Sequence, residues 1–236
     1  RSGEKKALTA VTISTRLASL KTFSHKYIYR HLELTNRDVL AKVERYEAPE
    51  RTKEGLTQAQ LEQVLGCYAD SDEYTHVRDR AMLAVYAASG LRFVEVLNLD
   101  LEQLDPYGGW IRTIGKGNRE RIVRIGDRAL KAVRAYRRVR RAQEGVTALF
   151  TTDAGGRLTY SGGQSIFRRL KKASGLPWMH SHRFRHTWAQ TALKKGAERS
   201  IVQDAMGWAS DRMARRYEGW VRQQTAAAAM PTYAPI

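Results

Sequence analysis

The chain has 236 residues, a mass of 26.8 kDa and a formal net charge of +17, from 41 lysines and arginines against 24 acidic residues. This length suffices for one ordinary domain with an appendage, and so large a positive excess favours a polyanionic partner, foremost nucleic acid. No apolar run approaches the roughly 18 residues of a membrane-spanning helix and no signal-peptide pattern opens the chain, so a membrane is not the expected partner.

Cys67 is the only cysteine, which excludes an internal disulfide and fits the reducing environment of the cytoplasm. The sequence has no Cys/His cluster at zinc spacing, no Walker loop and no dinucleotide fingerprint. We therefore expect no metal and no cofactor, and any chemistry would be carried by side chains. Because the chain begins with Arg1 rather than methionine, we expect it to be a portion of a longer product.

Apolar residues at helical spacing predict a small helical lobe over residues 8–46, with a second helical segment that includes Val39, Val43 and Tyr46. The polar stretch Ala48–Gly55 contains proline, glycine and several charges, which is typical of a linker. The predicted organisation is a first lobe over residues 1–50, a linker over 51–55 and a second domain over 56–236.

The second domain begins with Thr57-Gln-Ala-Gln60, a capping box for a helix that buries Leu61, Val64 and Leu65. Residues 76–89 predict another helix, which Gly90 ends, so that Arg92 follows a helix terminus.

Alternating and β-branched residues at 110–114 and 121–125 predict a β-hairpin with Lys116 between two glycines near its tip. A long basic helix is predicted from about Arg128 to Gln143. The expected fold is therefore mainly α with a small antiparallel β-hairpin, an α+β class. The charged residues from Arg112 to Arg141 are basic, except Glu120 and Asp127. A solvated surface could explain this run, but solvated surfaces usually mix charges of both signs. The one-sided charge therefore favours contact with phosphates.

Several polar and aromatic residues of the second domain have both a structural and a chemical explanation. His182, Arg185 and His186 recur at i, i+3 and i+4, so they share one helical face and can meet one anionic group, or form an ordinary basic surface. Glu95 can orient Arg92 or form a surface ion pair with it. Periodicity alone also allows Trp208 and Tyr217 to be packing aromatics, and Lys116 to be a solvent-facing hairpin residue.

Taken together, these segments resemble the tyrosine recombinase (phage integrase) family in order and approximate spacing. The resemblance runs from about Thr9 to Gln224 and rests on Ser89–Glu95, Ile114–Arg121, His182–His186, and Gly207-Trp208 with Tyr217 nine residues on. It implies a recombinase catalytic domain preceded by a partial helical core-binding (SAM-like) domain, because the lobe before Glu50 resembles only the second half of that domain. It further implies a catalytic set whose members are Arg92, Lys116, His182, Arg185, Trp208 and Tyr217.

The implied chemistry is cleavage and rejoining of DNA strands through a 3′-phosphotyrosyl link, without metal or ATP. Arg92 and Arg185 would hold the phosphate, Lys116 would protonate the leaving oxygen, and His182 would accept or share the proton of the Tyr217 phenol. Trp208 stands where most members have histidine, which exchanges a proton relay for packing and one N–H donor.

The resemblance also implies partners: double-stranded DNA, and further copies of the chain as a dimer to tetramer on DNA, docked through a C-terminal tail predicted as a helix over Trp220–Met230. Such an enzyme of DNA integration, typical of mobile genetic elements, is expected in the cytoplasm at the nucleoid. Two alternatives remain: a type IB topoisomerase-like nicking and closing enzyme, and a catalytically silent DNA-binding protein.

Overall fold

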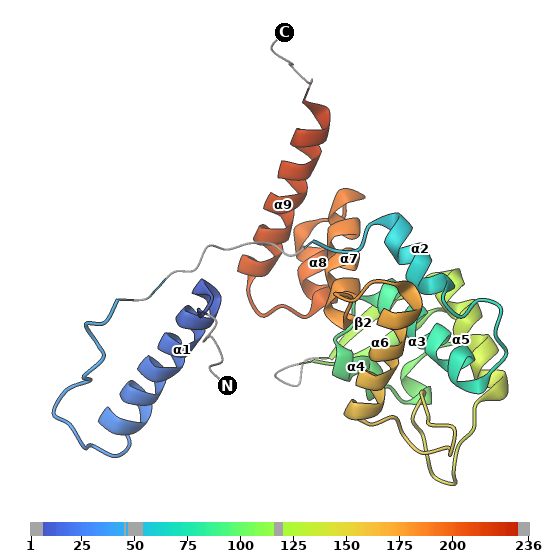
Figure 1. Ribbon diagram of the computed structural model, residues 1–236, viewed down its shortest axis with the longest axis horizontal. Helices are drawn as coiled ribbons and strands as arrows, with labels where there is room; N and C mark the ends of the chain where they lie inside the picture. Colours follow the sequence, from blue (N-terminus) through green and yellow to red (C-terminus); the bar gives the residue numbers. More distant parts are fainter. Residues whose placement is uncertain (1–6, 45, 47–53, 116–119, 231–236) are drawn as a thin grey trace, which may run out of the picture. The chain divides into compact units, whose positions relative to one another are not determined.

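The computed structural model describes residues 7–44, 46, 54–115 and 120–230, and the chain divides into two compact units, Arg1–Arg51 and Thr52–Ile236. The described elements are mainly helices, together with one two-stranded antiparallel sheet (Figure 1). The predicted fold class, mainly α with a small β-hairpin, is confirmed. Assignment of the first unit as a partial core-binding domain stays a prediction.

The first unit consists of α1 (Ala10–Phe23), the π-helical turn η1 (Ser24–Tyr29) and turns that follow. The predicted second helical segment through Val39 and Val43 is wrong for the described residues, since residues 30–44 contain no further helix. Asp38 explains part of this, because its carboxylate accepts hydrogen bonds from Ser24 Oγ at 2.6 Å and from the Leu40 amide at 3.1 Å. Such local bonds between side chains and backbone compete with the helical ladder. No apolar side chain described in this unit is buried, so burial does not favour a helix there either.

The second unit is organised around α3 (Tyr74–Ser89), which is buried along most of its length and packs against α5 and α7 (Figure 1). The predicted capping box is present: Thr57 and Gln60 cap α2 (Gln58–Gly66), which buries Val64 and half-buries Leu61 and Leu65. As predicted, α3 ends at Gly90, whose φ of 62° is left-handed. A Cβ there would also lie 3.1 Å from the Trp188 ring, so both conformation and space favour glycine.

After α4 (Phe93–Leu97) and η2 (Leu101–Gln103) come the paired strands β1 (Trp110–Ile114) and β2 (Glu120–Arg124). Their register runs from Trp110 opposite Arg124 to Ile114 opposite Glu120, and it places Ile111 and Val123 together in the core. The predicted hairpin is confirmed, although its tip at residues 116–119 lies outside the described residues.

The basic helix α5 (Asp127–Val139) ends earlier than predicted. Arg140 leaves the helix with φ −57° and ψ 127°, and its guanidinium donates to the carbonyls of Val146 and Ala148. These bonds hold the chain in its turn toward α6 (Tyr160–Ser174).

The C-terminal part of the unit contains α7 (Ser181–Lys194), α8 (Arg199–Met206) and α9 (Asp211–Ala229), which contact one another around a small apolar cluster. The predicted terminal helix forms the second half of α9 rather than a separate element. Residues 222–230 are all exposed, so this half of α9 projects beyond α7 and α8 (Figure 1). Pro231, its predicted stop, lies outside the described residues.

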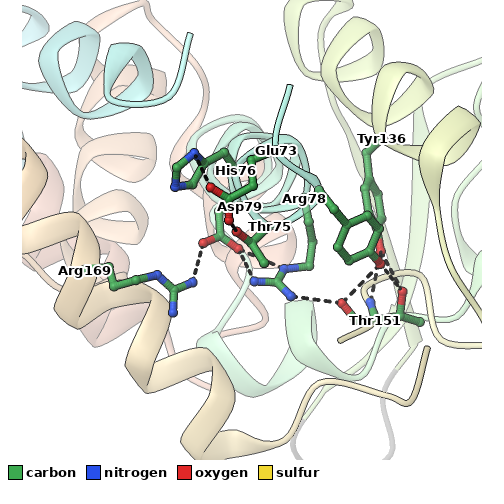
Figure 2. A network of polar contacts seen from close by, with 9 residues as sticks. Glu73, Thr75, His76, Arg78, Asp79, Tyr136, Thr151 and Arg169 are labelled. Atoms are coloured by element: carbon green, nitrogen blue, oxygen red, sulfur yellow. Dashed lines mark hydrogen bonds and ion pairs between the residues drawn. The ribbon is translucent and has the colours of Figure 1, made fainter. Parts of the chain in front are cut away.

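A buried ionic network joins α3 to its neighbours, as Figure 2 shows. Asp79 is fully buried and accepts bonds from Arg78 on the same helix and from Arg169 on α6, each at 2.7 Å. Arg78 also donates to the Thr151 carbonyl at 3.2 Å, and Tyr136 of α5 lies 2.9 Å from the Thr151 hydroxyl. The network therefore links α3, α5 and α6.

Replacing Asp79 with alanine should destabilise the protein by about 3 to 5 kcal/mol, because the buried Arg78 guanidinium loses its counter-charge. The free energy of unfolding in urea measures this. The control Arg215→Ala removes an ion pair between Asp211 and an arginine side chain that is 70% exposed, and should cost less than about 1 kcal/mol. Equal losses in the two variants would contradict the assigned role of Asp79.

Candidate active site

Arg185 lies at the centre of the site, on the inner face of α7. It is 6% exposed, and its guanidinium donates to the Gly90 carbonyl at 2.7 Å and to the Met206 carbonyl. Gly90 belongs to the turn between α3 and α4, and Met206 ends α8. Arg185 therefore joins three elements that lie far apart in the sequence.

Arg92 occupies the N-cap of α4, where Glu95 holds it in two ways. The carboxylate of Glu95 accepts the Arg92 backbone amide at 2.7 Å and its guanidinium at 2.9 Å. The second guanidinium nitrogen donates to the Gly207 carbonyl at 3.1 Å. Of the two roles left open for Glu95, a surface ion pair does not fit a side chain that is 9% exposed, and its bonds hold Arg92 in place. The Arg92 side chain keeps 32% of its surface exposed.

Three guanidinium groups donate hydrogen bonds to the C-terminal end of α8. Its successive carbonyls at Ala205, Met206 and Gly207 accept bonds from Arg121, Arg185 and Arg92 respectively. The last carbonyls of a helix lack partners within the helix and lie at the negative end of its dipole, which favours cations. Gly207 has a left-handed φ of 58°, which turns the chain at this point and leads directly to Trp208.

Tyr217 of α9 lies between two other candidate residues. Its ring stacks on Trp208 at 5.1 Å and on His186 at 5.6 Å, with interplanar angles of 22° and 27°. Its hydroxyl is hydrogen-bonded to His186 Nδ1. The Arg185 guanidinium lies 5.9 Å from the centre of the Trp208 ring, so the phenol and the arginine cluster share one region.

Burial shifts the pKa of both Tyr217 and Arg185. It raises the pKa of Tyr217 to about 12, although the charges of Arg185 and Arg216 act in the opposite direction. Burial, and then the charge of Arg92, lowers the pKa of Arg185 to about 10. At neutral pH the phenol is therefore protonated and Arg185 is cationic, so nucleophilic attack by Tyr217 requires a proton acceptor.

His182 lies one helical turn before His186 and lines a different cavity of about 340 Å³. Its ring centre is 6.2 Å from that of His180. The cavity is rich in basic and aromatic side chains; its lining is formed by Phe93, Tyr160, Gln164, Phe167, Arg168, Lys171, His180, Ser181 and His182.

The structure thus brings together four of the residues predicted from the sequence, namely Arg92, Arg185, Trp208 and Tyr217. His182 lies one helical turn away on α7 and lines a separate cavity. Lys116, the sixth, lies outside the described residues. Two further residues contact the cluster: His186, which the sequence placed on the same face without giving it the proton-transfer role, and Arg121. His186 could have been found from its i, i+4 spacing to His182, whereas no local pattern distinguishes Arg121 within a basic run.

Within the described ranges, no group of three or more histidine, cysteine or acidic side chains is arranged to hold a metal ion. The helices in the same ranges include none whose length and hydrophobicity would let it cross a membrane.

The comparisons with known proteins agree on one family. The model of the phage integrase family matches residues 54–221. A tyrosine recombinase XerC of Actinobacillus pleuropneumoniae is 32% identical over 207 residues, which cover 86% of this chain and 66% of that protein. A XerC of Pelotomaculum thermopropionicum is also 32% identical, over 86% of this chain and 69% of its own length. The chain therefore spans about two thirds of the length of these relatives.

Two solved structures have a similar fold. The XerH site-specific recombinase in a post-cleavage complex with its palindromic difH substrate has a TM-score of 0.70 at 22% identity, covering 94% of this chain and 67% of that one. The Tn1549 transposon integrase in complex with circular intermediate DNA has a TM-score of 0.70 at 19% identity, covering 95% and 80%. The match of the family model over most of the chain, together with these relatives, shows that the chain belongs to the phage integrase family of tyrosine recombinases.

Proposed function

We propose that this chain carries the catalytic part of a site-specific recombinase, which cleaves and rejoins double-stranded DNA through a 3′-phosphotyrosyl intermediate. The convergence of Arg92, Arg185 and Tyr217 around the end of α8 carries this proposal. The family supplies the reaction class, and the similar recombinases solved in complex with DNA support DNA as the partner.

The phenol oxygen of Tyr217 attacks the phosphorus of the scissile phosphodiester. A bond forms between that oxygen and phosphorus, while the bond to the 5′-oxygen breaks and leaves a 5′-hydroxyl. Because one phosphodiester replaces another, the step conserves bond energy and requires no ATP hydrolysis. Attack by a 5′-hydroxyl on the phosphotyrosyl link then rejoins a strand.

Arg92 and Arg185 hold the two non-bridging oxygens of the phosphate. Each already presents a guanidinium oriented by fixed carbonyls, and Glu95 also orients Arg92. Donors that are oriented before the reaction stabilise developing charge without reorganising, which is usually the largest contribution to this kind of catalysis.

Two proton transfers accompany the attack. The contact between His186 Nδ1 and the Tyr217 hydroxyl supports His186 as the first acceptor of the phenol proton, with His182 sharing this role from the same helix. Lys116, in the hairpin between β1 and β2, protonates the leaving 5′-oxygen. Trp208 holds the Tyr217 ring by stacking.

The reaction requires Tyr217 to be uncovered. Only 3% of this residue is exposed while it lies between Trp208 and His186. DNA cannot reach the phenol in this arrangement, so the start of α9 or the Tyr217 side chain must move before attack.

DNA binding relies on phosphate contacts from the hairpin and from the exposed basic side chains of α5, which are Lys131, Arg134, Arg137 and Arg138. The exposed C-terminal half of α9 docks on a second copy of the chain, so that several copies act together on DNA. Such an enzyme works in the cytoplasm, at the nucleoid.

A nicked suicide substrate tests the nucleophile. The wild type should form a covalent adduct that survives denaturing electrophoresis, and Tyr217→Phe should form none while it still binds DNA in a gel-shift assay, because only the hydroxyl is lost. The control Tyr107→Phe changes a tyrosine that is 86% exposed and should leave the adduct unchanged.

Each other outcome of this assay has a defined meaning. An adduct that persists in Tyr217→Phe assigns the nucleophile to another tyrosine, such as Tyr160 or Tyr233. DNA binding without an adduct in the wild type indicates a silent DNA-binding protein. An adduct that never joins a second duplex indicates a topoisomerase-like enzyme.

DNA affinity should fall steeply with salt concentration, because bound phosphates release counterions. In a plot of log affinity against log salt, Arg137→Gln and Arg138→Gln should each make the slope less steep by roughly 1. Arg157→Gln, which removes a charge paired with Asp100 outside this basic face, is the matched control and should leave the slope unchanged. Identical slopes in all four proteins would exclude α5 from the interface.

The raised pKa of Tyr217 predicts how stability depends on pH. Its folded-state value of about 12 exceeds the ordinary value of 10.0, so the buried neutral phenol contributes stability below pH 10 that is lost as pH rises toward 12. Relative to Tyr217→Phe, the wild type should lose about 1.4 kcal/mol of unfolding free energy between pH 8 and pH 11. Urea denaturation at both pH values measures the difference, and parallel pH profiles would show that the phenol is not buried in solution.

A further inference from the structure

Arg121 is the residue of strand β2 that reaches into the arginine cluster. Its side chain is 9% exposed, and its guanidinium donates to Glu95 Oε2 at 2.6 Å and to the Ala205 carbonyl at 3.0 Å. These partners belong to α4 and α8, so one side chain joins the hairpin to both elements that hold Arg92.

Glu95 connects Arg121 to Arg92. Its Oε1 accepts the Arg92 guanidinium, and its Oε2 accepts both the Arg92 backbone amide and Arg121. Burial alone would raise the pKa of Glu95, but the hydrogen bonds from Arg121 and Arg92 lower it below its ordinary value. The carboxylate is therefore ionised and divided between a phosphate-binding arginine on one side and Arg121 on the other.

The remaining guanidinium nitrogen of Arg121, Nη1, is buried and has no hydrogen-bond partner among the described residues. It packs against the turn at the end of α8, where a Cβ on Gly207 would lie 2.9 Å from it. Leaving a buried donor unpaired costs free energy. The side chain is nevertheless held in this position by its two other bonds, which indicates a geometric role rather than an optimised ion pair.

We propose that Arg121 is a positioning residue of the cleavage site, which fixes Glu95 and the end of α8 and thereby holds Arg92 in register with the phosphate. Arg121 also belongs to β2, which begins four residues after Lys116 in the sequence, so it connects that strand to the arginine pair. The inference rests on the proposed function, since it assigns a role within the same reaction. The proposed role of Arg121 differs from that of the exposed arginines in the basic run, which are proposed to bind DNA.

The test is single-turnover cleavage of the suicide substrate at saturating DNA, together with the dissociation constant for DNA. Arg121→Gln should slow formation of the covalent adduct by about 10²-fold, because small misplacements of a catalytic group have effects of this size, and should leave DNA affinity unchanged. Arg157→Gln is the control, because it removes an arginine that pairs with Asp100 outside the site. It should change neither the rate at saturating DNA nor the dissociation constant for DNA.

Two further variants keep the test independent of folding. Arg121→Lys retains the charge but cannot bind Glu95 and Ala205 as a guanidinium does, so it should fold and remain slow. Arg121→Ala should recover part of its rate when methylguanidinium is added, whereas a variant that is merely misfolded would not. The double variant Glu95→Gln/Arg121→Gln should lose much less rate than the product of the two single losses, because both changes remove the same interaction.

Three results would overturn the inference: a wild-type rate in Arg121→Gln or Arg121→Lys, a loss of DNA affinity without a loss of rate in Arg121→Gln, or full additivity with Glu95→Gln. Absence of an adduct in the wild type contradicts the proposed function instead, so the two failures are distinguishable.

Discussion

The attraction between the C-terminal carbonyls of α8 and the guanidinium groups of Arg92, Arg121 and Arg185 is the interaction on which the site depends. Positive charges brought this close together repel one another, and burial removes the water that would screen them. The end of a helix supplies unpaired carbonyls and the negative end of a dipole at the same place, and Glu95 supplies a full negative charge. These carbonyls and the Glu95 carboxylate therefore offset the repulsion among the three guanidinium groups.

Tyr217, the proposed nucleophile, is part of the packing of this unit. Tyr217 completes the small apolar cluster between α7, α8 and α9, where it contacts Trp208 and His186. Its reactivity is thus linked to the position of α9, since a phenol buried in this way is protonated and covered. The other end of the same helix is exposed from residue 222 onward, so α9 connects Tyr217 to an exposed surface.

Elements with strong local signals could be predicted from the sequence. The Thr57 capping box, the stop at Gly90 and the hairpin strands depend on residues that are neighbours in the chain, and all are present. The helical segment expected through Val39 and Val43 was wrong, because its apolar spacing was not matched by burial and Asp38 bonds locally instead. The predicted basic helix is longer than α5. Arg140 is a good helix former by propensity, but its side chain donates to carbonyls six and eight residues further on, and the helix ends before it.

The sequence by itself determined which residue types are present and which of them share a helical face, since the i, i+3 and i+4 spacing places Arg185 and His186 on the same side of the helix as His182. Only the tertiary structure decided that His186 contacts Tyr217, that Arg121 bonds Glu95, and that the phenol is buried. These contacts join residues that lie 26 and 31 positions apart in the chain. Periodicity limits the neighbours within a single element, whereas contacts between elements depend on how α4, α7, α8, α9 and the hairpin pack against one another.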